Sequence, residues 1–466
     1  AGKLHGYPGH EIAEMALLRL YAITKDEKHL KLAQYFIDKR GQPPLYFEEE
    51  GKRNGNALFW QDSYMKYQYY QAGKPVREQT AAEGHAVRAV YLYSGMADLA
   101  RLTGDEALFA ACKALYANIT KKQMYLTGAI GQSAYGEAFS YDYDLPNDTV
   151  YAETCAAIGL AFFARRMSAI EPRSEYADVV EKTLFNSIIS GMSLDGESFF
   201  YVNPLEALPQ ASLKDRRMGH VKIERQKWFG CACCPPNLAR IIASLGSYVH
   251  SAGTDTVYTH LYMGSESRLS LAGKEISIKI ETKYPWEGQI DVSLALEGKA
   301  AFTYGLRIPS WCGSFGLTLN GEDAAYTLTD GYALLNREWQ DGDRLRLLLD
   351  MPVRLMEANP RVRDNQGKAA LMRGPLVYCL EEADNGVELF KLRSGTPQDV
   401  KVRYEQELLQ GVCTVSFTGK KKRDWRDGAL YRNRAEDEYE DRELKFIPYY
   451  AWANRGGGEM TVWIHR

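Results

Sequence analysis

Two absences narrow the function of this 466-residue chain before any motif is considered. The chain has no run of about 18 apolar residues, which excludes a membrane-spanning helix of the usual length. It has no excess of one charge, because 57 basic residues stand against 60 acidic ones and the net charge is −3. This near balance gives no electrostatic reason to expect nucleic acid or a membrane as a partner.

Cysteine is scarce outside one short stretch. Three of the eight cysteines, Cys231, Cys233 and Cys234, are nearly adjacent. Neighbours this close could not all form disulfides without strain, so we expect a reducing compartment, the cytoplasm, with metal-bound thiolates. The chain begins Ala1-Gly2-Lys3 without an initiator methionine, and we interpret it as a fragment in which a signal peptide can be neither seen nor excluded.

Residues 1–256 have the pattern of paired helices. The turn Thr24-Lys25-Asp26-Glu27 separates two amphipathic segments, and a similar turn recurs at Thr103-Gly104-Asp105-Glu106. A third pair is predicted near 151–169 and 174–190. Repeated helical hairpins predict a solenoid or a toroid, and the long connections at 41–77 and 123–150 are where a helical toroid would place a functional site.

From Val257 onward the apolar residues alternate with a period of two. Segments such as Ile276-Ser277-Ile278-Lys279-Ile280 are separated by turns that contain glycine, which is typical of antiparallel strands. Residues 257–466 are therefore predicted to form one or two β-sandwich modules of the jelly-roll type. We expect these modules to brace a helical catalytic domain.

The cysteine-rich stretch, Trp228 to Asn237, opens a helix. Pro235 and Pro236 suit the first helical turn, where the missing N–H group costs nothing, and apolar residues follow at helical spacing as far as Val249. Cys233 and Cys234 are thus predicted at a helix N-terminus. The helix dipole and the free N–H groups there favour a thiolate, which is the form that attacks carbon and binds metals.

A second short motif supplies further metal ligands. Glu153 and Cys155 stand two residues apart at the start of another apolar helix. Together with the clustered cysteines they form a set of soft thiolates and one carboxylate, which suits tetrahedral Zn²⁺. By spacing alone, a catalytic zinc, a structural zinc knuckle and a buried thiol cluster without metal all remain open.

Four other residues are candidates for chemistry or sugar contact. Glu137 lies between Tyr135 and Phe139 in a loop with glycine, and we expect these aromatic surroundings to raise its pKa toward the range of a general acid. His10 and His85 open helices, where a cap or core role is the more frequent explanation, and Tyr201 lies in an aromatic run, where core packing is the default interpretation.

Five strings carry a specific resemblance. The chain resembles glycoside hydrolase family 127, the β-L-arabinofuranosidases, over essentially its whole length. The strings are GYPGHE (6–11), EGHAVRA (83–89), YDYDLPNDTVYAETCA (141–156), SGMSLDGESFFYVNPLE (190–206) and WFGCACCPPNLAR (228–240).

The resemblance implies an (α/α)6 barrel followed by β-sandwich domains, and a retaining exo-glycosidase with a cysteine nucleophile. It makes Cys233 the zinc-bound nucleophile and Glu137 the acid/base, and places Cys231 beside the metal. It also implies that part of the family's N-terminal region, with further barrel helices and sugar contacts, is absent from this chain. The implied zinc ligands are Glu153, Cys155, Cys233 and Cys234, and the implied sugar-subsite residues are His10, His85 and Tyr201.

The expected substrate is a small oligosaccharide or glycopeptide, such as a hydroxyproline-linked arabino-oligosaccharide, with no nucleic-acid or membrane partner. The aglycone, the linkage and the oligomeric state, a homodimer included, are left open. Two rival functions stand beside this one. The first is a non-catalytic carbohydrate-binding or scaffold protein with a structural zinc. The second is a hydrolase that uses metal-bound water, which would require a histidine-rich shell and an open coordination position.

Overall fold

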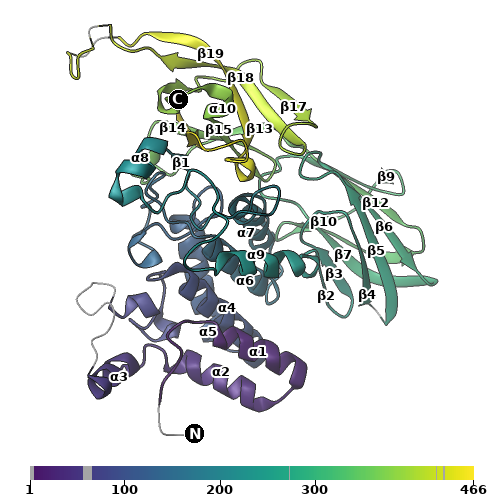
Figure 1. Ribbon diagram of the computed structural model, residues 1–466. Helices are drawn as coiled ribbons and strands as arrows, with labels where there is room; N and C mark the ends of the chain where they lie inside the picture. Colours follow the sequence, from purple (N-terminus) through teal and green to yellow (C-terminus); the bar gives the residue numbers. More distant parts are fainter. Residues whose placement is uncertain (1–4, 56–65, 272, 427, 434–435) are drawn as a thin grey trace.

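The computed structural model describes residues 5–55, 66–271, 273–426, 428–433 and 436–466 (Figure 1). Helices dominate as far as residue 248, and strands dominate from residue 250 onward. The predicted order, α followed by β in several parts, is confirmed. Within the described ranges, no helix is long and apolar enough to cross a membrane.

The helical part begins with the predicted hairpins. Asp26 caps α2 by accepting a hydrogen bond from the Lys28 N–H at 3.0 Å, and Asp105 caps α5 by accepting one from the Leu108 N–H at 2.8 Å. Both capping residues lie in the two turns that the sequence singles out. The α-helices are α1 (Ala13–Thr24), α2 (Glu27–Lys39), α3 (Tyr46–Asn54), α4 (Ala86–Thr103), α5 (Glu106–Asn118), α6 (Thr154–Ser168), α7 (Ser174–Lys182), α8 (Pro209–Lys214) and α9 (Cys234–Ala243).

Helices α4 and α6 form the centre of the helical part and are buried along most of their length. They approach closely at Gly159, where an added Cβ would lie only 2.4 Å from Val90. The absence of a side chain at Gly159 therefore permits the contact. This packing holds the N-terminus of α6, with Glu153 and Cys155, inside the domain.

Two helix ends refine the prediction. The chain after α7 continues as helical turns through Thr183–Ile188 and Ile189–Gly191, in agreement with the predicted extent to residue 190. Helix α9 ends at Ala243 and a 3-10 helix over Leu245–Tyr248 follows it, so the predicted helical extent toward Val249 is confirmed, but not as one continuous α-helix. The Ser244 hydroxyl donates to the Arg240 carbonyl at 2.9 Å, and such a side-chain bond competes with the helical ladder.

Two sheets follow the helical part, one of five and one of six strands. Their orders are β10-β11-β7-β3-β2 and β4-β5-β6-β12-β8-β9, and only β3 and β7 pair in parallel among these strands. Apolar side chains from both sheets form one hydrophobic cluster around the buried Trp339. The strands are β2 (His250–Ala252), β3 (Thr256–Thr259), β4 (Ser265–Leu271), β5 (Lys274–Thr282), β6 (Gln289–Leu296), β7 (Lys299–Arg307), β8 (Phe315–Leu319), β9 (Glu322–Asp323), β10 (Thr327–Thr329), β11 (Tyr332–Gln340) and β12 (Arg344–Leu349).

A ten-stranded sheet ends the chain, and the helical part contributes its first strand, β1. Because β1 pairs with β20, backbone hydrogen bonds join the two parts. Arg225 adds a second link, since it donates to the carbonyls of Ser190 at 2.9 Å and Trp452 at 2.7 Å. The elements are β1 (Glu206–Ala207), β13 (Val353–Met356), β14 (Lys368–Arg373), β15 (Leu376–Glu381), α10 (Glu382–Asn385), β16 (Leu392–Arg393), β17 (Lys401–Glu405), β18 (Val412–Lys422), β19 (Tyr439–Pro448), β20 (Met460–Thr461) and β21 (Trp463–His465).

The predicted connections 41–77 and 123–150 hold few regular elements. The first contains α3 and two short 3-10 turns, and its residues 56–65 lie outside the described residues. The second contains one 3-10 turn at Tyr135–Glu137. Both connections supply residues to the cavity described below, as the toroid interpretation expected.

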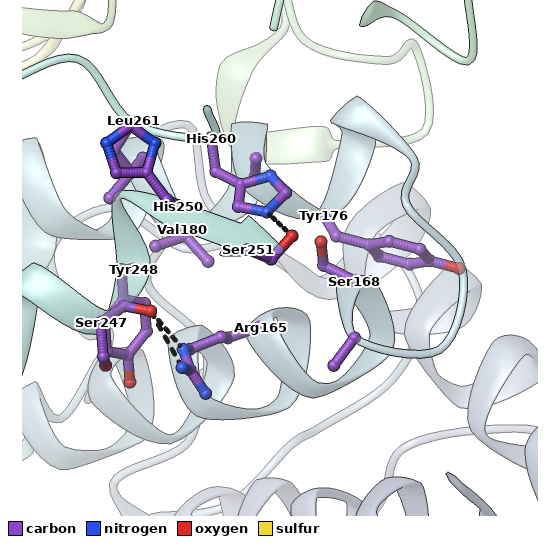
Figure 2. Close-up of a pocket in the computed structure, with 12 residues that line it drawn as sticks. Arg165, Ser168, Tyr176, Val180, Ser247, Tyr248, His250, Ser251, His260 and Leu261 are labelled. Carbon is purple, nitrogen blue, oxygen red and sulfur yellow. Dashed lines mark hydrogen bonds between the residues drawn. The ribbon is translucent and has the colours of Figure 1, made fainter. Parts of the chain in front are cut away.

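The helical part meets the middle sheets at a cavity of about 80 Å³ that residues of both parts line, where His260 and Ser251 are hydrogen-bonded at 2.7 Å (Figure 2). On its helical side the Arg165 guanidinium of α6 donates to the Ser247 carbonyl at 2.9 and 3.1 Å. The buried Arg307 at the end of β7 joins the two parts directly, since it bonds to Asp178 at 2.6 Å and to Glu181, both on α7.

We expect Arg307→Met to destabilise the protein by about 3–5 kcal/mol, because it leaves two poorly solvated carboxylates without their cation. Arg346→Met is the matched control: Arg346 also lies 2.6 Å from a carboxylate, Asp291, but is 59% exposed, so its loss should cost less than about 1 kcal/mol. Urea unfolding followed by fluorescence measures both changes. Equal shifts of the two midpoints would contradict the assigned role.

Candidate active site

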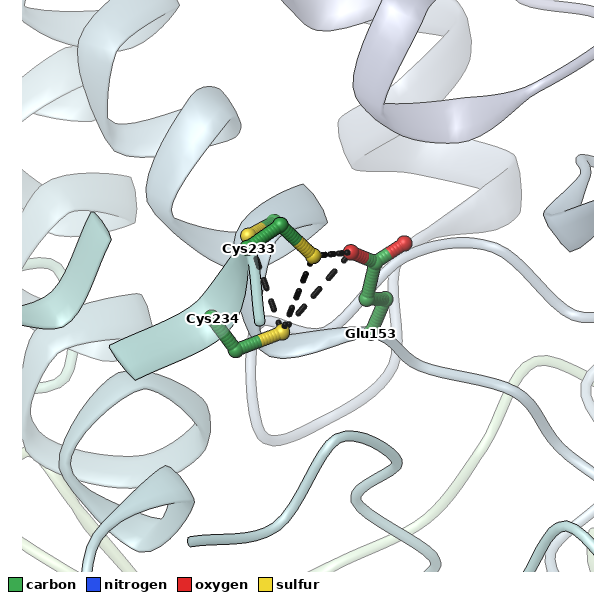
Figure 3. Close-up of side chains that lie close together, drawn as sticks. Glu153, Cys233 and Cys234 are labelled. Carbon is green, nitrogen blue, oxygen red and sulfur yellow. Dashed lines mark hydrogen bonds between the residues drawn. The ribbon is translucent and has the colours of Figure 1, made fainter. Parts of the chain in front are cut away.

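Four side chains from two helix N-termini meet in one cluster (Figure 3). The ligand atoms of Glu153, Cys155, Cys233 and Cys234 all lie within 4.8 Å of one another. The Cys233 sulfur is 3.3 Å from Glu153 Oε1 and 3.7 Å from the Cys234 sulfur, which is 3.6 Å from that of Cys155. The structure thus brings together the residues of both short motifs.

Local backbone geometry explains how these residues converge. Glu153 is the N-cap of α6 and Cys155 lies in its first turn, while Cys233 is the N-cap of α9 and Cys234 its first residue. The prediction that α9 begins at the cysteines, with its prolines in the first turn, is confirmed. Two helices therefore point their positive ends at one group of potential metal ligands.

The buried carboxyl group of this cluster lacks a countercharge, which a bound cation would supply. The Glu153 side chain is buried, with 3% of its surface exposed, and its Oε2 atom has no hydrogen-bond partner within the described part of the chain. Burial, and then the nearby Cys233, raise the pKa of Glu153 far above its usual value. Three sulfurs and one carboxylate are donors suited to a soft divalent metal, so the residues fit a metal centre.

Cys233 differs from the other sulfurs of the cluster. Cys155 and Cys234 are buried, whereas Cys233 is half-buried; Cys233 and Cys155 both line a cavity, and Cys233 is the more exposed of the two. Hydrogen bonds from the Cys155 and Cys234 thiols, with a further one from the Tyr201 hydroxyl at 3.4 Å, lower the pKa of Cys233 far below its usual value. Cys233 is thus the member of the cluster that is both ionised and accessible.

Glu137 lies on the same cavity and has two hydrogen-bond partners. His85 Nε2 lies 3.1 Å from Glu137 Oε2, and the Tyr151 hydroxyl donates to Oε1 at 2.9 Å. Burial raises the pKa of Glu137, but the bonds from His85 and Tyr151 outweigh it, so the net pKa is lowered. The expectation of a raised pKa, which rested on Tyr135 and Phe139, was wrong, because His85 and then Tyr151 form hydrogen bonds to the carboxyl group that outweigh its burial.

These groups surround a cavity of about 680 Å³, large enough for a sugar unit and part of its neighbour. All three predicted sugar-contact residues, His10, His85 and Tyr201, line it, together with Glu137 and Cys233. The structure adds residues that sequence reasoning missed: Tyr69, Arg88, Tyr91, Tyr151, Asn237 and Arg240.

The missed residues had little signal of their own. Tyr91 on α4 accepts hydrogen bonds from Asn237 at 2.8 Å and Arg240 at 3.1 Å on α9, which are contacts between helices about 150 residues apart in sequence. Tyr151 had one available signal, its place two residues before Glu153. Arg88 lies inside the string EGHAVRA that already drew attention to His85.

Comparison with known proteins gives a consistent result across the chain. Models of three domains match: the GH127 β-L-arabinofuranosidase catalytic domain over residues 1–247, the GH127 middle domain over 256–351 and the glycoside hydrolase family 127 C-terminal domain over 353–465. A curated non-reducing end β-L-arabinofuranosidase of Bifidobacterium longum subsp. longum is 43% identical over 477 residues, covering 100% of this chain and 72% of the relative.

Comparison with solved structures leads to the same family as the comparison of sequences. A GH127 β-L-arabinofuranosidase from Geobacillus stearothermophilus T6 superimposes with a TM-score of 0.96 at 49% identity, covering 100% of this chain and 73% of the other. A second structure, described as a GH127 β-arabinofuranosidase, has a TM-score of 0.87 at 39% identity and covers 99% of this chain and 69% of the other.

The helical part is joined to β-sheets and contains a sugar-sized cavity with a carboxyl group and a thiol on its wall. Together with the matching catalytic-domain model, this arrangement places the protein among the glycoside hydrolases. Within that class the chain belongs to glycoside hydrolase family 127. The resemblance seen in the five sequence strings is confirmed.

We expect removal of bound divalent metal with a chelator to lower the melting temperature, because the buried Glu153 would lose its countercharge. Glu153→Gln and Cys155→Ser should bind metal weakly and be insensitive to the chelator. Cys312→Ser, which alters a half-buried free cysteine outside the cluster, is the control and should behave as the wild type. Metal content by atomic emission, together with thermal unfolding, decides the question. Full metal occupancy in the Cys155→Ser protein would argue against the ligand set.

Proposed function

We propose that the protein is a retaining, exo-acting β-L-arabinofuranosidase that releases L-arabinose from non-reducing ends. Its substrates would be small oligosaccharides or glycopeptides, such as hydroxyproline-linked arabino-oligosaccharides. The observation that carries the proposal is the position of Cys233, a half-buried sulfur on the wall of the same cavity as Glu137. The names of the similar proteins support the choice of sugar.

In the proposed reaction a terminal sugar lies in the cavity, and His10, His85 and Tyr201 contact its hydroxyl groups. The Cys233 sulfur attacks the anomeric carbon while Glu137 gives its proton to the departing oxygen, so one C–O bond breaks and one C–S bond forms. Glu137 then takes a proton from water, whose oxygen displaces the sulfur. Two inversions at the anomeric carbon leave the configuration of the product unchanged.

Glu153, Cys155, Cys233 and Cys234 would hold Zn²⁺ in this proposal. The bound ion would keep the Cys233 thiol ionised and reduce its basicity, which favours its later departure from the sugar. The N-terminus of α9 and the Tyr201 hydroxyl act on the same sulfur in the same direction.

The lowered pKa of Glu137 sets a condition on this mechanism. In the free protein its carboxyl group is ionised at neutral pH, since its pKa lies below the ordinary value near 4.5. A general acid must carry a proton, so we propose that Glu137 gains one as the sugar displaces water from the cavity. Desolvation, already the largest influence on this carboxyl group, then increases and raises its pKa.

The proposal also covers the fold of the protein and its cellular compartment. We propose that the helices belong to an (α/α)6 barrel and that the two middle sheets form a β-sandwich, which their shared hydrophobic cluster supports. We also propose a reducing compartment, the cytoplasm, because the cluster needs three free thiols and all eight cysteines are free.

Two rivals are less well supported. A purely structural zinc site would be closed, whereas Cys233 borders a large cavity that also holds Glu137. A hydrolase using metal-bound water would require a histidine-rich shell, and the four-residue cluster contains no histidine. His85 lies nearby, within 4.8 Å of carboxylate oxygens of Glu137 and Glu153, but its ring bonds to Glu137.

Glu137→Gln should lose about 10²–10⁴-fold in kcat/KM on an alkyl β-L-arabinofuranoside, because a poor leaving group needs the proton that glutamine cannot give. The loss should be much smaller on the p-nitrophenyl glycoside, and azide should restore turnover. Asp142→Asn, in the same loop and paired with Lys122 on the surface, is the control and should keep full activity. Equal losses on both substrates without azide rescue would indicate a structural role for Glu137.

Cys233→Ser should be inactive even where the metal is retained, because a serine hydroxyl in this place is a far weaker nucleophile. A haloacetamide derivative of L-arabinofuranose should label Cys233 alone, as read by peptide mass spectrometry, and NMR in the first seconds of turnover should show the β-anomer. A panel of p-nitrophenyl glycosides tests the sugar. Labelling at Glu153 or Cys234, or an inverted product, would rule out the proposed nucleophile.

A further inference from the structure

A second cavity, of about 350 Å³, lies where all three parts of the protein meet. The helical part supplies the C-terminal half of α7, the middle part supplies the loop after β7, and the C-terminal part supplies β13 and β14. Figure 1 shows α7 between the middle sheets and the C-terminal sheet. This cavity shares no lining residue with the one that contains Cys233 and Glu137, so it is a separate site.

The acidic side chains on its wall are already engaged. Asp178 and Glu181 bind the buried Arg307, and Glu175 pairs with Arg173 at 2.7 Å. Glu181 also accepts a hydrogen bond from the Trp311 indole at 3.1 Å. These carboxylates therefore have their ion pairs with Arg307 and Arg173, and within the described residues none of them forms an ion pair with Lys182 or Arg354.

Two basic side chains on the same wall lack such partners. Lys182, in the last turn of α7, forms no ion pair or hydrogen bond through its ammonium group within the described residues. Arg354 on β13 forms no ion pair there either; it donates to the Gly374 carbonyl at 3.1 Å, and its buried Nε has no partner. Burial lowers the pKa of Lys182, Asp178 opposes this in part, and the charge of Arg354 lowers it further.

Two like charges beside a cavity, one on the mostly buried Lys182 and one on the half-buried Arg354, are unfavourable for the folded protein unless an anion joins them. The other residues that line the cavity indicate which further chemical groups the anionic ligand contains. Leu126, Met356, Met372 and Trp311 offer apolar surface, and Thr120 and Ser310 offer hydroxyl groups. The volume is also too large for an inorganic ion alone. Apolar surface, hydroxyl groups and a guanidinium fork together suit a sugar-sized molecule with one oxyanion.

We propose that this cavity is a binding site for a sugar acid, a monosaccharide-sized molecule carrying a carboxylate or phosphate group that Lys182 and Arg354 hold. Because its wall comes from all three parts of the chain, bound ligand would connect them and stabilise the folded state. The site does not depend on the proposed glycosidase reaction, and a failure of either proposal leaves the other standing.

Calorimetric titration and thermal unfolding of the full chain test the proposal with four probes: D-glucuronate, D-glucose 6-phosphate, D-glucose and inorganic phosphate. We expect one or both sugar acids to bind and to raise the melting temperature, with D-glucose much weaker. The two sugar acids distinguish a carboxylate from a phosphate. Equal binding of D-glucose, binding of inorganic phosphate alone, or no binding by any probe would overturn the proposal.

Lys182→Met and Arg354→Met should each weaken binding about 10-fold or more, since each removes a charged hydrogen-bond donor. Lys39→Met is the matched control, because Lys39 also lies in the last turn of a helix, α2, away from this cavity. It should bind as the wild type does. Unchanged binding in the Lys182 and Arg354 variants would place the ligand elsewhere and refute the assignment.

The same variants separate a binding role from a structural one. Without ligand, Lys182→Met and Arg354→Met should keep or raise the melting temperature, because each removes an unpaired charge. Lys182→Met should keep its glycosidase activity, as the two cavities share no residue. A clear fall in the melting temperature of both variants in the absence of ligand would show that the two cations support the fold instead.

Discussion

A carboxylate buried among three thiols is the constraint on which this structure depends. Glu153 is almost fully enclosed, and one of its oxygens has no partner within the described residues. A buried charge of this kind is unfavourable unless something positive lies against it. The two helix N-termini that meet at the cluster supply part of that field, and a bound cation would supply the rest.

The helical packing serves this arrangement. The close contact of α4 with α6 at Gly159 fixes the helix that begins at Glu153, and Asn237 and Arg240 tie α9 to Tyr91 of α4. The result is that Cys233 and Glu137 face one cavity from separate segments of the chain. Different neighbours lower the two pKa values in that cavity. His85 and Tyr151 lower the pKa of the Glu137 carboxyl group, and the other thiols of the cluster lower that of the Cys233 thiol.

The β-sheets brace the helical part through apolar and polar contacts: Phe200 stacks on Trp452 in a hydrophobic cluster shared with the C-terminal sheet, and buried arginines add ion pairs and hydrogen bonds. Arg307 binds α7 from the middle sheets, and Arg225 and strand β1 connect the helices to the C-terminal sheet. Buried arginines are specific in geometry but costly to leave unpaired, so these junctions define how the parts are placed. The cavity with Lys182 and Arg354 lies at this junction, and it is where the pairing of charges is incomplete.

Sequence alone determined the order of helices and strands, the capping turns at Asp26 and Asp105, and the start of α9, because these depend on local periodicity and on residues adjacent in the chain. Motifs also identified the members of the cluster. Only the tertiary structure decided the partners Tyr151 and Arg240 and the direction in which the pKa of Glu137 moves. A pKa depends on what lies within a few ångströms in space, and His85 stands 52 positions from Glu137 in the chain yet 3.1 Å from it in the fold.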